Sequence, residues 1–191
     1  MGTTALHGMG VSQRRRESLN LATDMADRES LVSENNPISV FVTHTFEESD
    51  DYLRVFEFLE SVDKFYYLNV AKPENTPSEG GVEAIKDELI QQIKSSEAFV
   101  VVSDVYGKDP DLVSFMMDVA EANDIGKIVI KPFGGLAETA PEVVDGVQEH
   151  IEWNDRELVD AIKRQGRGEE TARWEVIDFP GYDADGEIGE S

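Results

Sequence analysis

The chain has 191 residues, of which 40 are acidic and 17 are basic, so its formal net charge is −23. This length suits one α/β domain with a short segment at each end, and a hydrophobic content of 40% is enough for a packed core. The acidity argues against binding to nucleic acid or to an anionic membrane surface, and the absence of cysteine excludes disulfides, thiolate catalysis and cysteine-ligated metals.

The acidic charge is concentrated in the predicted domain. Residues 1–36 hold 5 acidic and 4 basic residues, residues 37–165 hold 27 and 11, and residues 166–191 hold 8 and 2. An acidic tail alone therefore does not account for the charge. Two explanations stay open, namely ordinary solubility and adaptation to a salt-rich, halophilic cytoplasm.

The same segments define the expected organisation: a mobile N-terminal extension over residues 1–36, an α/β domain over 37–165 and an acidic C-terminal tail over 166–191. No apolar run has the ~18 to 20 residues that a membrane span needs, and none follows the early arginines as a signal peptide would. We therefore expect a cytoplasmic protein that does not associate with membranes.

The first half of the domain alternates strand and helix patterns. Residues 38–43 form a nearly continuous apolar run, typical of a strand buried on both faces of a parallel sheet. Ser49 is a predicted N-cap for a helix over residues 50–61. A second strand is predicted at 65–70, and a second helix near 82–93.

The second half continues the alternation. Its predicted elements are a central strand at 98–103, a loop at 104–109, a helix from Pro110 to Gly126, a strand at 127–131, a partly helical connection at 136–147, a strand at 150–153 and a helix from Asn154 or Asp155 to about 165. The alternation predicts an α/β fold with a five-stranded parallel sheet, helices on both faces and the flavodoxin-like strand order 2-1-3-4-5.

In such a sheet, ligands bind outside the carboxyl ends of the strands, beside the point where the strand order reverses. We expect a ligand site there, with a ring of the ligand against the first strand's loop and a second stacking surface across from it. His44 and Tyr106 are expected at the rim of this site and not in the core. The five predicted ligand-binding residues are His44, Thr45, Phe46, Ser103 and Tyr106.

Three blocks in this order resemble TIR and TIR-like domains. The run from Val40 to Asp50, VFVTHTFEESD, is similar to the first strand and loop of that family. A second block runs from Gly81 to Tyr106, and the third comprises Lys131-Pro132-Phe133-Gly134 and Glu152-Trp153-Asn154, which resemble compact archaeal and bacterial TIR-like proteins of the Thoeris defence family. The resemblance covers about residues 38–165.

The resemblance implies a signalling or adaptor domain in prokaryotic anti-phage defence. Such a domain would bind a nucleotide-type ligand, whose base or ribose we expect against Phe46 and His44. Its protein partner would be a second copy of itself or another defence protein. Tyr66, Tyr67 and Leu136 are the side chains that we expect to be exposed for self-association.

The resemblance also bears on catalysis. Catalytic TIR domains carry a Trp, or a similar residue, followed four positions later by a Glu, and these positions fall at Leu112 and Met116 here. A thioether cannot act as a base or a carboxylate, and Met116 fits the core stripe of its helix, so we expect little or no NAD hydrolysis. The alternative is an NAD-cleaving enzyme that makes a cyclic ADP-ribose-like messenger, with Asp118 or Glu121 as the catalytic carboxylate and NAD as substrate.

Receiver domains share the flavodoxin-like order and offer another reading. Asp104 follows the third strand, Lys131-Pro132 follows the fourth, and Glu47 and Glu48 lie in the first loop. Carboxylates that far into a loop are poorly placed to hold Mg²⁺, so phosphotransfer is the weaker alternative. No phosphate-binding glycine motif, hydrolase elbow or metal-spaced histidine pair is present, and we expect neither a metal nor a resident cofactor.

Overall fold

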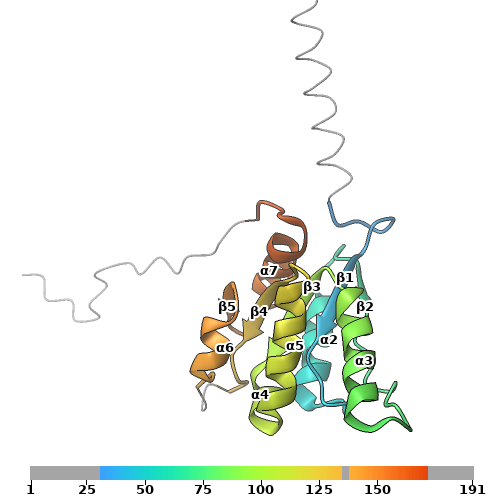
Figure 1. Cartoon of the computed structure of the whole chain (residues 1–191). Helices are drawn as coiled ribbons and strands as arrows, with labels where there is room; N and C mark the ends of the chain where they lie inside the picture. The colour runs from blue at the N-terminus through green and yellow to red at the C-terminus, as the bar shows by residue number, and fades with distance from the viewer. Residues whose placement is uncertain (1–30, 135–137, 172–191) are drawn as a thin grey trace, which may run out of the picture.

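A five-stranded, all-parallel sheet with the order β2-β1-β3-β4-β5 forms the centre of the protein (Figure 1). The computed structural model describes residues 31–134 and 138–171. The strands are β1 (Ile38–Val42), β2 (Tyr67–Asn69), β3 (Ala98–Val102), β4 (Gly126–Ile130) and β5 (Glu149–Ile151). The predicted flavodoxin-like order and the parallel pairing are confirmed.

Helices cover both faces of the sheet, as predicted. They are α2 (Asp50–Ser61), α3 (Gly81–Lys94), α4 (Ser103–Lys108), α5 (Pro110–Ala122), α6 (Pro141–Asp145) and α7 (Asp155–Arg167). The pair α2 and α7 packs together on one face, and the pair α3 and α5 packs together on the other (Figure 1). No helix within the described ranges has both the length and the apolar character that crossing a bilayer requires.

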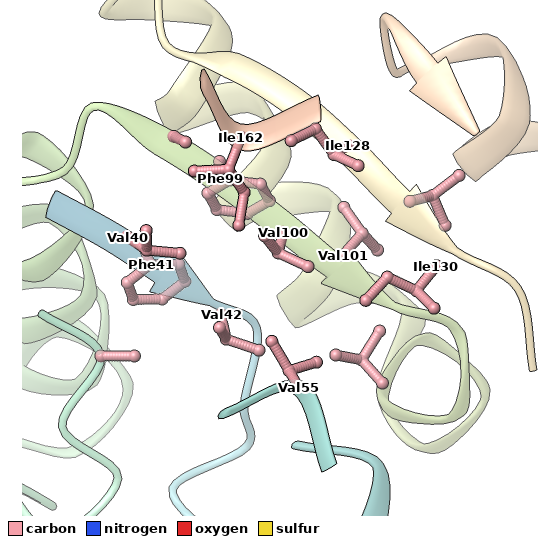
Figure 2. Packing of buried hydrophobic residues seen from close by; sticks show 14 of the residues in the cluster. Val40, Phe41, Val42, Val55, Phe99, Val100, Val101, Ile128, Ile130 and Ile162 are labelled. Atoms are coloured by element: carbon pink, nitrogen blue, oxygen red, sulfur yellow. The ribbon is translucent and has the colours of Figure 1, made fainter. Parts of the chain in front are cut away.

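Side chains from both faces make one core around β1, β3 and β4. All five residues of β3 are buried, because the central strand has neighbouring strands on both sides and helices above and below. Phe41 and Phe99 are paired in register, and their rings stack with centroids 5.3 Å apart. Figure 2 shows these two rings beside the valines of the same strands, together with Val55 of α2 and Ile162 of α7.

Polar side chains fix the starts of the helices. The Ser49 hydroxyl accepts a hydrogen bond from the backbone N–H of Tyr52, which confirms the predicted cap of α2. The side chain of Asn154, and not that of Asp155, caps α7 by accepting from the N–H of Glu157.

Three predicted elements differ clearly from the structure. One is the helix predicted from Pro110 to Gly126, which ends at Ala122, while Gly126 begins β4. The predicted loop at 104–109 is wrong, because β3 runs directly into the short helix α4, whose Val105 is buried. The Nζ of Lys108 lies 3.4 Å from the Asp104 carboxylate one turn earlier. The second strand is shorter than predicted, because only three residues of β2 pair with β1.

A buried arginine at the end of α7 ties the two ends of the described chain to the sheet. The Arg167 guanidinium donates to both carboxylate oxygens of Glu97, at 2.9 and 3.1 Å, and to the carbonyls of Asn36 and Pro37. At the preceding residue, a Cβ on Gly166 would lie 2.6 Å from the Ile38 side chain, so glycine permits this close approach. The segment before β1 is therefore held against the last helix.

Candidate functional site

The carboxyl ends of β1 and β3 lie side by side where the strand order reverses, as the sequence predicts for a ligand site. Two hydroxyls at this edge make internal hydrogen bonds. The buried Thr43 Oγ1 accepts from the N–H of Val102 at 3.0 Å, and Ser103 Oγ donates to the carbonyl of Ile130 at 2.8 Å. Ser103 Oγ also lies 3.4 Å from Thr139 Oγ1. These hydroxyls join neighbouring strand ends and support the edge.

His44 is fully buried, so the prediction that it lies at the rim of the site is wrong. Its Nδ1 lies 3.1 Å from the backbone N–H of Phe46, which donates to it, and its Nε2 lies 3.1 Å from the Gln92 side-chain oxygen. Because Nδ1 accepts a hydrogen bond, the ring is neutral and Nε2 carries the proton that it donates to Gln92. Both ring nitrogens are thus engaged inside the protein.

Gln92 of α3 extends the contacts of His44 into a network. Its buried side-chain oxygen accepts a second hydrogen bond from the N–H of Lys72, and its amide nitrogen donates to the Lys72 carbonyl and to Glu88. The imidazole therefore connects the loop after β1 with α3 and with the loop after β2. In this network the His44 imidazole has a structural role.

Burial lowers the pKa of His44, against the opposing effects of the hydrogen bond to Gln92 and of the nearby Glu74 carboxylate. In the unfolded chain the imidazole takes up a proton near its ordinary pKa of about 6.5. The unfolded state therefore binds more protons below that pH, and the stability that His44 contributes is present above about pH 6.5 and is lost as the pH falls.

We expect the melting temperature to fall as the pH is lowered from about 7.5 to about 5, with one group contributing at most about 1.4 kcal/mol per pH unit. His44→Gln, which removes the titrating ring, should give a flatter profile in this window. His150→Gln is the matched control, because His150 is exposed. Parallel profiles for the wild type and His44→Gln, measured by calorimetry, would contradict a buried neutral imidazole.

Thr45 and Phe46 are partly exposed beside His44. The backbone of Phe46 has a φ of 58°, a left-handed conformation that is costly for a bulky residue. It is held there by the hydrogen bond from its N–H to His44 and by the edge-to-face contact of the two rings, whose centroids are 5.3 Å apart. Phe46 thus covers the imidazole.

Met116 is fully buried in α5, which confirms that it belongs to the core. Leu112, which the resemblance noted in the sequence would place at the Trp position, is partly buried and packs against the same core. Neither side chain of the aligned pair offers a polar atom to a ligand.

The structure brings together Tyr106, Asp118 and Glu121, which line a cavity of about 190 Å³ that α4, α5 and α6 border. His44, Thr45 and Phe46 do not line it. Lys127, which also lines the cavity, is buried and pairs with the exposed Glu121 carboxylate, and this hydrogen bond and charge lower the pKa of Glu121. A carboxyl group held ionised in this way is unsuited to act as a general acid.

The residues of the phosphotransfer reading are not assembled into a site. One carboxylate oxygen of Asp104 is buried without a hydrogen-bond partner, and the other lies near Lys108. Lys131 pairs instead with Glu152. Glu47 and Glu48 are exposed, and within residues 31–134 and 138–171 no three histidine or carboxylate side chains are grouped so that they could hold a metal ion.

The side chains expected to support self-association are less exposed than the sequence suggested. Tyr67 stacks on Phe56 and Phe65, and its hydroxyl donates to Glu60. Tyr66 is half-buried, and Leu136 lies outside the described residues. The exposed large apolar side chains of the described part are Leu31, Leu53, Leu68, Val82 and Phe133.

Sequence reasoning missed one group at the carboxyl edge. Phe133 follows β4, Trp153 follows β5, and Arg54 lies in the second turn of α2. The Arg54 guanidinium lies 3.7 Å from the centroid of the Phe133 ring and 5.6 Å from that of Trp153. The signal available in the sequence was one aromatic residue shortly after each of the last two strands.

No family model matches the chain, and no curated protein sequence matches it at a significant level.

Proposed function

We propose that this chain is a TIR-like signalling or adaptor domain of prokaryotic anti-phage defence. It binds a nucleotide-type ligand, or a protein partner, at the carboxyl edge of the sheet and hydrolyses little or no NAD. The observation that carries the proposal is the burial of two side chains. His44, expected in the ligand site, has both ring nitrogens engaged internally, and Met116, at the expected place of a catalytic carboxylate, is packed in the core. Aromatic surface, in contrast, is exposed at the same edge.

The second candidate is an NAD-cleaving enzyme. It is favoured by one observation, namely that Asp118 and Glu121 share a cavity with Tyr106. In that reading Tyr106 would stack on a ring of the substrate, and Asp118 would face the sugar, since Glu121 is engaged by Lys127.

An NAD assay separates the two candidates. Purified full-length protein, alone and with lysate of phage-infected cells, should release no more nicotinamide from NAD than the matching blank does, as measured by chromatography. The same assay with Asp118→Asn and Glu121→Gln is the control, and each variant removes one exposed carboxylate. Glu121→Gln also takes the charged partner from the buried Lys127, so circular dichroism has to show that this variant is folded. Release by the wild type that either variant abolishes would establish the enzyme and reject the adaptor.

A further inference from the structure

Four side chains form a group that we name the edge aromatic cluster: Arg54, Phe58, Phe133 and Trp153. Phe58 and Arg54 come from α2, while the other two follow β4 and β5. Trp153 meets Phe58 at 5.4 Å and Phe133 at 5.6 Å between ring centroids, in both cases edge to face. The cluster therefore joins α2 to the carboxyl ends of the last two strands.

The cluster is held in place before any ligand arrives. The indole N–H of Trp153 donates to the carbonyl of Lys131 at 2.7 Å, which fixes the plane of its ring. Arg54 is oriented by its ion pair with Asp51, three residues earlier on the same helix. A ligand that stacks here would not have to order these side chains, which reduces the entropic cost of binding.

Phe133 presents an open aromatic surface within this frame. The guanidinium of Arg54 covers the ring from one side at 3.7 Å, yet 54% of the residue is exposed. An exposed phenylalanine that stacks with a fixed arginine provides a flat apolar surface for another ring. Among the exposed large apolar side chains of the described part, Phe133 is the aromatic one.

The charges of the cluster indicate what kind of ring it would accept. Arg54 and Lys131 place two cationic groups at this corner of a chain whose formal charge is −23, and each is paired with one carboxylate, Arg54 with Asp51 and Lys131 with Glu152. A polyanion such as nucleic acid would be repelled by the rest of the surface, whereas the single phosphate of a small ligand would have to replace only Asp51 or Glu152 as the partner of one cation. Arginine also binds phosphate and stacks on rings through its planar guanidinium.

We propose that the edge aromatic cluster is the ring-binding subsite for a mononucleotide. The base stacks on the open surface of Phe133, and the phosphate lies near Arg54 and Lys131. This inference rests on the proposed nucleotide ligand, but it moves the base away from Phe46 and His44, where the sequence placed it.

Fluorescence of Trp153 tests the inference directly. The chain has two tryptophans, so a full-length Trp174→Phe variant leaves Trp153 as the sole tryptophan, which is excited selectively at the red edge of its absorption. Titration with AMP should quench this emission with a saturable curve, adenosine should bind several-fold more weakly, and ribose 5-phosphate should not quench. Equilibrium dialysis of AMP measures binding independently of its position.

Variants at the cluster give the expected effects. Base stacking on an aromatic side chain contributes strongly to the free energy of binding. Phe133→Ala should therefore weaken AMP binding roughly tenfold or more. Phe133→Leu keeps an apolar side chain but loses the ring and should weaken binding similarly. Arg54→Gln should remove the preference for AMP over adenosine. Leu68→Ala, at the opposite edge of the sheet, is the matched control and should change nothing.

Three outcomes would overturn the inference. If AMP binds in dialysis but Trp153 emission and Phe133→Ala have no effect, the subsite lies elsewhere while the proposed nucleotide function stands. If AMP does not bind at millimolar concentration, both the subsite and a mononucleotide ligand are rejected. If Phe133→Ala abolishes self-association in light scattering and leaves AMP binding unchanged, the cluster is a protein-docking surface.

Discussion

Exchanging Met116 for glutamate should destabilise the protein by more than about 4 kcal/mol, and in a marginally stable domain that loss amounts to unfolding. The side chain is fully buried among apolar residues of α5 and the sheet. A carboxylate there loses its hydration without gaining a partner, and its neutral form still leaves polar atoms buried. The substitution puts glutamate at the position that the proposed TIR-like resemblance assigns to a catalytic carboxylate, so it tests whether that position lies in a site.

Met116→Leu is the matched control, because it conserves volume and apolar character and should cost less than about 1.5 kcal/mol. Denaturant unfolding followed by circular dichroism measures both variants. A Met116→Glu protein that is as stable as the wild type would show that position 116 reaches solvent. Nicotinamide release from NAD by that variant would further show that the fold can present a catalytic carboxylate there.

Arg167→Met should lower the free energy of unfolding by about 2–4 kcal/mol, since removal of one partner leaves the groups that it paired with unsatisfied. The arginine side chain is 8% exposed, whereas that of Glu97 is 37% exposed, so water compensates part of the loss at the carboxylate. The carbonyls of Asn36 and Pro37 each lose one donor as well, although that of Asn36 keeps the hydrogen bond from the N–H of Ser33.

Arg167→Lys should give an intermediate loss, because an ammonium keeps the charge but not the forked geometry. Arg156→Met, an exposed arginine of the same helix, is the control and should lie within about 0.5 kcal/mol of the wild type. A double-mutant cycle with Glu97→Gln measures the pairwise part of the effect. An Arg167→Met protein as stable as the control would show that the contacts contribute nothing net.

The sheet was predictable from the sequence because β1 and β3 are nearly continuous apolar runs, and the segments between the strands show helical spacing. The helix α2 was predicted with its observed bounds, since Ser49 supplies a cap and the apolar residues repeat at helical intervals. The helix α4 was missed for a physical reason. Six residues make too few turns to show a periodic apolar face, and β3 enters it without a turn signal.

The candidate site was harder to predict because its environment comes from distant segments. A polar residue after a strand reaches solvent only when no other element covers it, and Gln92, 48 residues further along the chain, covers His44. The edge aromatic cluster likewise depends on α2 meeting the ends of β4 and β5. The sequence gives the position of each of these residues separately, whereas their contact in space follows from the topology of the fold.

The helix α7 has a consequence for how the protein is made. It packs on β1, β3, β4 and β5, so the apolar side chains that β1 turns toward it have no cover until residues about 120 positions later have been synthesised. At about 5–20 residues per second, translation leaves this surface open for roughly 6–25 seconds. During that interval the nascent chain exposes β-rich apolar segments that favour aggregation. Chaperone binding to the emerging polypeptide would protect the segments that α7 finally seals.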